Sequence, residues 1–223
     1  MGSQKFTTVV FLFALLALIV MPASAEWLMD FAVGGAFTTS ADVTSQDPSS
    51  RTNGTGRFET SFTFDGRTGY FLESLPWLGL ALDASYFSPD AQVTVGSLTF
   101  DKADLTVVPI SLLAMLRLPL FPIGDMPGGA LQPYVAVGPS LMIADIEAPL
   151  APRLPPFRDT AMELGLDGRA GLGWHFDRHV GLFVEYRFTY VKPTFEDVIQ
   201  GVRVQVKTQL ETHHVLLGVG FRF

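Results

Sequence analysis

Two kinds of side chain alternate along Val180-Gly181-Leu182-Phe183-Val184-Glu185-Tyr186-Arg187-Phe188-Thr189-Tyr190. The even-numbered positions are all aliphatic or aromatic, whereas the odd-numbered ones include Gly181, Glu185 and Arg187. A period of two residues is typical of a β-strand, because successive side chains point to opposite faces of a sheet. The segment 180–190 is therefore predicted to be a strand with one continuous apolar face and one face that carries charge.

Similar alternation recurs along the chain and predicts eight strands in all. The other strands are expected at about 27–38, 58–72, 78–86, 105–117, 134–143, 164–176 and 214–223. The register of 105–117 stays open, because that segment is apolar on both faces; an inward Arg117 would send Val108, Ile110, Leu112 and Leu116 outward. Long polar connections, read as loops, are predicted at 39–56, 88–102, 146–162 and 191–206, and shorter ones at 74–77, 118–131 and 177–179. The expected fold is all-β: an eight-stranded antiparallel up-and-down transmembrane β-barrel.

The first 25 residues have the three parts of a signal peptide. Lys5 is the one charge before Glu26, residues 6–21 are almost wholly apolar, and Ala23-Ser24-Ala25 supplies a small-x-small cleavage pattern. An uncleaved membrane anchor is the alternative, but the apolar stretch is short for a span. We therefore expect a signal peptide over 1–25, cleaved near Ala25, and one barrel domain over 26–223.

The composition of the chain excludes several classes of partner and of structure. The chain has a formal net charge of −7 and no cysteine, which argues against nucleic acid as a partner and excludes disulfides and a lipidated cysteine. Hydrophobic residues make up 48% of it, yet the part after the leader holds no apolar run long enough for a transmembrane helix. An exported chain of this kind is either a soluble β protein or a membrane barrel.

The distribution of charge and aromatic rings favours the membrane barrel over a soluble, lipocalin-like one. The charged face mixes Asp and Arg with Gly, Ala and Ser, which suits a narrow polar interior, while large aliphatics occupy the other face. Aromatic rings cluster at strand ends, as in the interfacial belts of membrane proteins. They are Trp27, Tyr70, Trp77, Trp174, Phe176 and Phe223 on the short-turn side, and Phe37, Phe58, Tyr86, Phe188 and Tyr190 on the long-loop side.

Three segments carry a resemblance to a known family: QPYVAVG at 132–138, GLFVEYRF at 181–188 and LLGVGFRF at 216–223. They resemble the small outer-membrane barrels of the OmpA/OmpX kind, the outer membrane protein β-barrel domain family. The resemblance implies a barrel in the cell outer membrane of a Gram-negative bacterium. It also implies that Phe223 acts as an insertion signal for the barrel-insertion machinery. It implies an architecture rather than one function, because one fold hosts many functions.

The inward face collects acids and arginines. The predicted interior ion-pair network comprises Asp30, Glu59, Asp65, Arg67, Asp83, Arg117, Asp167, Arg169, Glu185 and Arg187, with Glu73 and Arg222 on the same face. One interpretation is an ion path. The other is a structural plug of salt bridges, which we favour because side chains fill the interior of an eight-stranded barrel.

Two adjacent histidines, His213 and His214, raise the question of a metal site or a catalytic base. Neighbouring strand residues point to opposite faces, so the two rings cannot chelate one ion. We expect one to be inward and hydrogen-bonded and the other to lie near the outer interface. Membrane lipid A deacylases resemble this chain in size but use a His-x-Ser element, whereas Val215 and Leu216 follow here. We therefore expect no catalysis, no metal and no cofactor.

Long connections of a membrane barrel face outward and commonly carry recognition. Within them, we expect a hairpin tip at Gly96-Ser97 and an outward extension of the last strand over 202–206. The loop cations are candidates for contact with lipopolysaccharide phosphates or with an extracellular protein, against the alternative of scattered surface charge: Lys102, Lys192, Arg203 and Lys207, with Arg57 nearby. Three functions remain open: a structural or surface-interaction barrel, a small pore for ions or apolar solutes, and a lipid-modifying enzyme.

Overall fold

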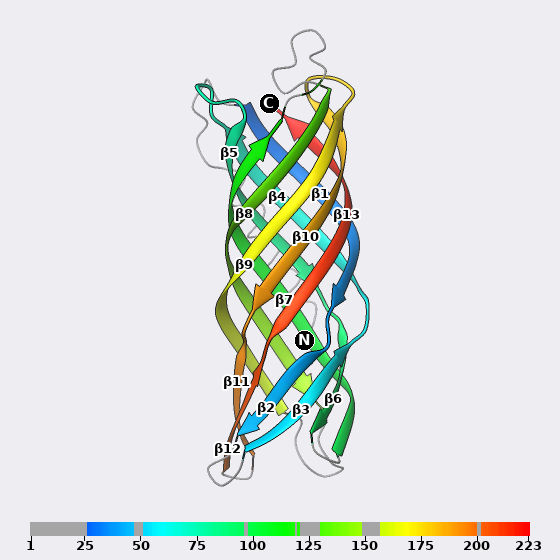
Figure 1. Cartoon of the computed structure of the whole chain (residues 1–223), viewed down its shortest axis with the longest axis vertical. Coiled ribbons are helices and arrows are strands. Elements are labelled where there is room, and N and C mark those ends of the chain that lie inside the picture. The colour runs from blue at the N-terminus through cyan, green and yellow to red at the C-terminus, as the bar shows by residue number, and fades with distance from the viewer. Residues whose placement is uncertain are drawn as a thin grey trace.

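The computed structural model describes residues 26–46, 51–95, 98–118, 120, 130–148, 157–199 and 202–223 (Figure 1). The predicted signal peptide, the Gly96-Ser97 tip and most of the 118–131 connection lie outside the described residues. No helix of the described part is long and apolar enough to cross a membrane. The described strands are β1 Glu26–Thr38, β2 Ala41–Gln46, β3 Arg51–Phe58, β4 Ser61–Phe71, β5 Leu78–Phe87, β6 Asp90–Val95, β7 Leu98–Arg117, β8 Leu131–Ala148, β9 Phe157–His175, β10 Val180–Val191, β11 Thr194–Ile199, β12 Val202–Thr208 and β13 Leu210–Arg222.

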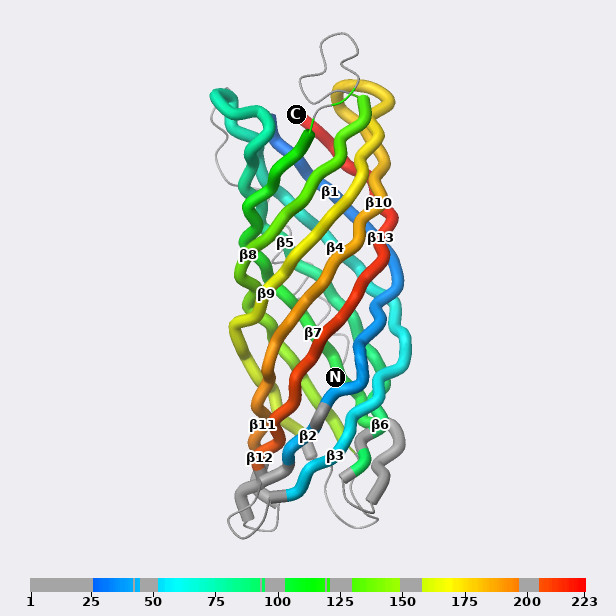
Figure 2. Tube along the Cα trace, viewed as in Figure 1, coloured from blue at the N-terminus to red at the C-terminus, as the bar shows by residue number. Residues whose placement is uncertain are grey.

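These elements combine into eight long antiparallel strands that close into one barrel (Figure 2). Breaks of one or two residues separate β1 from β2, β3 from β4, β5 from β6, β10 from β11 and β12 from β13. Each long strand pairs with the long strands before and after it in the sequence, as β7 does with β8. The pairing of β1 with β13 closes the ring. The predicted eight-stranded antiparallel barrel is therefore confirmed.

The short-turn half of the barrel is apolar outside, and its lumen holds buried charges beside two small apolar clusters that include Leu28 and Phe183. Phe62, Leu164 and Leu217 are among its exposed side chains, and they are 82%, 77% and 63% exposed. Charged residues such as Asp83 and Arg187 are buried in the lumen of the same half. Leu112 and Leu116 of β7 are exposed while Arg117 is buried, which settles the register that the sequence left open. Lipid contact requires this arrangement.

The other half reverses that polarity. Its lumen is filled by a cluster of apolar side chains: Ala36, Phe87, Leu105, Val107, Met142, Ala144, Ala161, Val191, Phe195 and Leu210. Its outer face carries polar residues such as Arg57, Asp104 and Glu196, all exposed. This is the pattern of a barrel in water, so the wall continues beyond the membrane. The length of β9 agrees, because a tilted span needs only about 9–11 residues and β9 has 19.

Two predictions about this outer half are wrong. The segments 39–56, 88–102, 146–162 and 191–206 are not mainly loops, because they contain β2, β3, β6, β11 and β12 and the outer ends of β7, β8 and β9. Phe58 packs against the inner apolar cluster instead of joining an outer aromatic belt. The break at 59–60 changes which face the alternating positions occupy, and a strict period of two cannot anticipate such a break.

Two finer predictions about the same half are confirmed. Val93↔Phe100 and Val95↔Leu98 pair on either side of the predicted hairpin tip. The extension after Val202 forms β12, which pairs with β11 and β2. The outer half is therefore built of paired hairpins rather than of open loops.

The wall of the outer half is interrupted between β9 and β11. The β9–β10 ladder runs outward as far as Leu166↔Tyr190, and beyond it β11 pairs with β12 alone among the described residues. Pro193 lies at the point of divergence and has no N–H with which to continue the ladder. Across the gap, the Glu196 backbone N–H donates to Asp159 Oδ2 at 2.7 Å.

At the opposite end, a short turn joins β9 to β10 (Figure 1). The Asp177 carboxylate accepts hydrogen bonds from the backbone N–H groups of His179 and Val180, at 2.7 and 2.9 Å. These bonds hold the pKa of the Asp177 carboxyl below its usual range. An Asx-type turn of this kind ends one strand and starts the next within very few residues.

The close approach of β1 to β13 predicts that a side chain at Gly34 would destabilise the barrel. A Cβ at Gly34 would lie 1.9 Å from the Val215 carbonyl oxygen of β13. We expect Gly34→Ala to lower stability by about 1–3 kcal/mol, because backbone must move to relieve the overlap. Thermal unfolding in detergent, followed by circular dichroism, measures the change. Gly168→Ala is the matched control, since a Cβ at Gly168 meets nothing within 4 Å; equal midpoints for the two variants would contradict the prediction.

Candidate functional site

The distinctive site of the chain is a network of charges in the lumen of the short-turn half. Strand register brings its members to neighbouring inward positions, with Asp30 opposite Arg67, Arg67 opposite Asp83 and Arg187 opposite Arg169. The side chains that form it are at most 1% exposed. Residues far apart in the sequence thus meet in a space closed to solvent.

Arg67 of β4 forms the first link across the lumen. Its Nη2 donates to Asp30 Oδ2 at 2.8 Å, and its Nη1 donates to Glu185 Oε2 at 2.7 Å. The Tyr134 hydroxyl donates to the same Glu185 oxygen at 2.6 Å. In the sheet, β1 and β13 lie between β4 and β10. The Arg67–Glu185 bond therefore crosses the interior instead of following the wall.

Arg169 of β9 forms the centre of the network. Nη2 contacts Asp83 Oδ1 at 2.5 Å and Asp167 Oδ2 at 2.9 Å. Nη1 contacts Glu185 Oε1 at 3.1 Å and Asp65 Oδ2 at 3.2 Å. One guanidinium thus joins carboxylates from β4, β5, β9 and β10, which uses the planar fork that distinguishes arginine from lysine.

Arg187 of β10 closes the network on the side of the apolar cluster. Its Nη1 lies 3.1 Å from Asp65 Oδ2 and its Nη2 lies 2.8 Å from Asp167 Oδ2. Nη1 also donates to Ser85 Oγ at 2.5 Å. Ser111 Oγ donates to Asp167 Oδ2 at 2.7 Å. Paired charges and hydroxyls therefore occupy the level at which an ion path would have to run.

Two further arginines lie nearer the short turns. Arg222 Nη1 donates to Asp30 Oδ1 at 2.6 Å. Arg117 holds both carboxylate oxygens of Glu26, at 2.6 and 2.7 Å, and its guanidinium carbon lies 3.7 Å from the centre of the Phe71 ring. Sequence reasoning missed Glu26. Its alternation with Leu28 and Asp30 would have placed it on the inward face.

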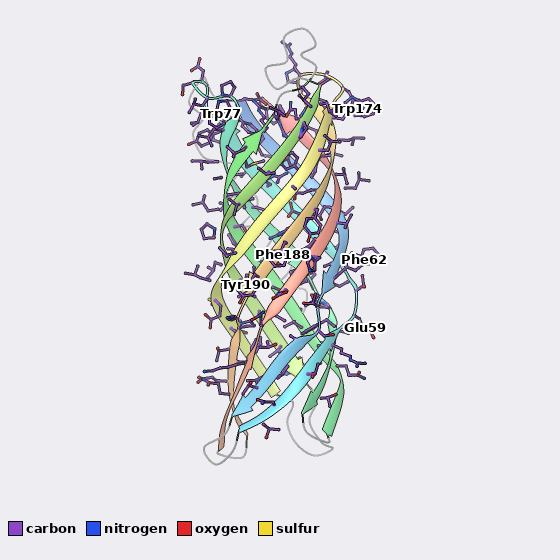
Figure 3. All side chains as sticks on the ribbon, in the orientation of Figure 1. Glu59, Phe62, Trp77, Trp174, Phe188 and Tyr190 are labelled. Atoms are coloured by element: carbon purple, nitrogen blue, oxygen red, sulfur yellow. The ribbon has the colours of Figure 1, made fainter. Side chains whose placement is uncertain are left out.

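The expected inward orientation is wrong for Glu59 and Glu73. Both side chains are exposed (Figure 3 labels Glu59). Glu59 lies in the break between β3 and β4, and Glu73 lies in the connection between β4 and β5. The structure brings together the other predicted members of the network. Arg117 joins it through Glu26, whose Oε1 lies 3.9 Å from Arg222 Nε.

The two histidines lie on opposite faces, as expected from their adjacency. His213 faces outward, where its Nδ1 shares a 2.6 Å hydrogen bond with the Tyr186 hydroxyl. His214 is buried in the lumen, edge-on to Phe87 with ring centroids 4.9 Å apart. The expected inward hydrogen bond is wrong, because neither ring nitrogen of His214 has a partner among the described residues.

Of the four predicted loop cations, the structure describes the side chains of Lys192 and Lys207. Lys207 is exposed on β12, and Lys192, also exposed, places Nζ 5.7 Å from the centre of the Tyr190 ring. The side chains of Lys102 and Arg203 lie outside the described residues. Phe223, the predicted insertion signal, is 65% exposed at the short-turn end. In the described part of the chain, no three His, Cys, Asp or Glu side chains are grouped to hold a metal ion.

A small cavity lies between the network and the short turns. Arg67, Arg117, Arg222, Tyr134 and His175 are among the residues that line it. It has room for about one water molecule. The lumen at this level is therefore nearly filled, and what the arrangement does chemically is to neutralise buried charge and tie opposite sides of the wall together.

Comparisons with known proteins agree with this architecture. Residues 11–223 match the family described as outer membrane protein beta-barrel domain. No curated protein matches the chain. Among solved structures, outer membrane protein OprG from Pseudomonas aeruginosa is similar at 16% identity, with 90% of this chain and 96% of that chain covered and a TM-score of 0.67. Neisserial surface protein A is similar at 14% identity, with 89% and 97% covered and a TM-score of 0.52.

Identities this low show the fold alone, whereas the family match covers almost the whole chain. The apolar outer face, the polar lumen and the closed antiparallel wall are features of the same architecture. The chain belongs to the outer membrane protein β-barrel domain family and is a small barrel of the bacterial outer membrane.

Proposed function

We propose that this protein is a structural and surface-interaction barrel that carries out no catalysis and does not conduct ions. The salt bridges across the lumen, above all Arg67–Glu185 and Arg169–Asp83, are the observation that carries the proposal. Each carboxylate of the central network has a guanidinium partner, and an ion would have to break such pairs to pass. Buried pairs with good geometry hold their partners in place.

The outer half supplies the surface for interaction. Its wall carries polar residues outward on hairpins that project past the lipid. Partners in keeping with this surface are lipopolysaccharide and an extracellular protein ligand. In this proposal the chain is exported by a signal peptide cleaved near Ala25 and is inserted by the barrel-insertion machinery, which reads Phe223.

The proposal predicts the orientation of the barrel. Barrels of this kind insert from the periplasm, so short turns remain inside and long hairpins emerge. The chain has no cysteine, so single cysteines report position cleanly. A membrane-impermeant maleimide applied to intact cells should label Arg57→Cys and spare Arg178→Cys, both at exposed positions. Permeabilising the outer membrane should expose the second site; the reverse labelling would contradict the topology.

The network should stabilise the fold strongly. Arg187→Ala leaves Asp65 and Asp167 without one of their buried partners, and breaking such a pair typically costs about 3–5 kcal/mol. The thermal midpoint in detergent should fall clearly. The matched control is Arg158→Ala, whose partner Glu147 and own side chain are 47% and 59% exposed, because exposed pairs contribute about 0–1 kcal/mol. A wild-type midpoint for Arg187→Ala would contradict a stabilising role.

Conductance recordings in planar bilayers test whether the barrel has a structural role or is a pore for ions. The purified wild-type barrel should show no steady channels, because the lumen is filled at the level of the network. Arg169→Ala removes the central guanidinium and should admit water and brief conductance events if the variant folds. Steady unit conductance in the wild type would overturn the proposal.

A second candidate function, passage of small apolar solutes, is favoured by one observation. The lumen of the outer half is filled by apolar side chains, including Phe195 and Ala161, and this apolar cluster lies beside the interruption between β9 and β11. In the double variant Asp159→Cys and Glu196→Cys, oxidation would form a disulfide that links β9 to β11 across this interruption. The barrel is reconstituted into liposomes and the uptake of an apolar dye is measured. Uptake that decreases when the disulfide forms would favour transport over the structural role. If the reduced barrel takes up no dye, transport of apolar solutes is excluded.

A further inference from the structure

An unusual polar pair lies on the outward, lipid-facing side of the wall. The Tyr186 hydroxyl of β10 and His213 Nδ1 of β13 are 2.6 Å apart, and Tyr186 is 46% exposed. Phe188 and Phe37 are the cross-strand neighbours of His213 on its two sides. Ionisable residues in membrane spans are rare and usually face the interior, so an outward histidine calls for a ligand or a polar surrounding.

Strand geometry places this pair at the outer edge of the apolar band. His213 precedes Phe223, which is exposed at the short-turn end, by 10 residues. At about 3.4 Å per residue and a tilt of about 40°, the two lie about 26 Å apart along the barrel axis. That separation is close to the height of an outer-membrane apolar band, about 25 Å. Phe188 and Tyr190 of the neighbouring strand lie near the middle of the long barrel, remote from Trp77 and Trp174 (Figure 3).

The chemistry of the pair suits an anion. When Tyr186 donates to Nδ1, the neutral ring carries its proton on Nε2 and remains a donor there; a protonated ring donates from both nitrogens and adds a positive charge. Just beyond the outer end of β10, Lys192 places its ammonium 5.7 Å from the centre of the Tyr190 ring. The nearby Glu211 of β13 accepts a 2.6 Å hydrogen bond from the Gln209 amide.

We propose that His213, oriented by Tyr186 and flanked by aromatic rings, binds a phosphate of an outer-leaflet glycolipid, with Lys192 as a second cationic contact. Phosphorylated lipopolysaccharide is the lipid that occupies this depth in the outer leaflet. Its acyl chains would lie against the apolar wall below the pair, where Val215 and Leu217 are 53% and 63% exposed. Tyr186 is a positioning residue, and His213 is the group that touches the phosphate. The proposal rests on the outward orientation of the outer half.

The test uses the full barrel in a maltoside detergent, so that added lipid A is the sole source of phosphorus. With ¹⁵N-labelled histidine, solid-state NMR of frozen micelles should show dephasing of a histidine nitrogen by ³¹P. His213→Gln should abolish the signal. The matched control is His179→Gln at the opposite end, an exposed histidine in the β9–β10 turn, and it should retain the signal.

Thermal unfolding supplies a second, independent measurement. Lipid A should raise the wild-type midpoint, and His213→Gln and Tyr186→Phe should each lose at least half of that rise while unfolding cooperatively without lipid. Lipid A stripped of its phosphates should give less than half of the wild-type rise. An equal rise with dephosphorylated lipid A, or with inorganic phosphate alone, would overturn the proposal, as would a full rise in His213→Gln. These results do not depend on whether the lumen conducts, which bilayer recordings decide separately.

Discussion

In hydrocarbon, each backbone N–H and C=O group must find its partner within the protein, and this constraint organises the whole molecule. The antiparallel ladders satisfy it by closing the sheet through the β1–β13 and β7–β8 pairs. With eight strands the ring is narrow, and its lumen holds side chains rather than a water column. Polar groups that point inward must then satisfy one another. The guanidinium groups of Arg67, Arg169 and Arg187 do this for the buried carboxylates.

Along each long strand, the apolar side chains change from the outer face of the wall to the lumen. In the short-turn half, Leu164 and Leu217 face lipid while Asp167 and His214 face the lumen. Farther out, Phe195 and its neighbours fill the lumen and charged residues face outward. The change follows from the solvent outside the wall, which is lipid at one level and water at the next. The outer half therefore has its own apolar core, and it can remain a rigid sheet where loops would otherwise begin.

This change of solvent explains which parts of the fold could be predicted. Alternation in 180–190 and in the other membrane segments identified the strands and their inward charges, because one face was apolar and the other polar. The sequence predicts loops where β2, β3 and β11 form, because polar segments near turns lack a strong apolar face. A strict period of two predicts an inward Glu59, whereas the break at 59–60 leaves it exposed, and nothing in the local sequence marks that break.

By itself, the sequence determined the class of fold, the number of strands and the set of inward arginines, since these follow from a period of two and from the residues that lipid excludes. The tertiary structure alone decided which charges meet. Arg67 reaches Glu185 because closing the barrel brings β4 and β10 to opposite sides of one narrow lumen. It also paired Tyr186 with His213 on the lipid-facing side. Such contacts depend on register and closure, which are properties of the assembled sheet rather than of any one strand.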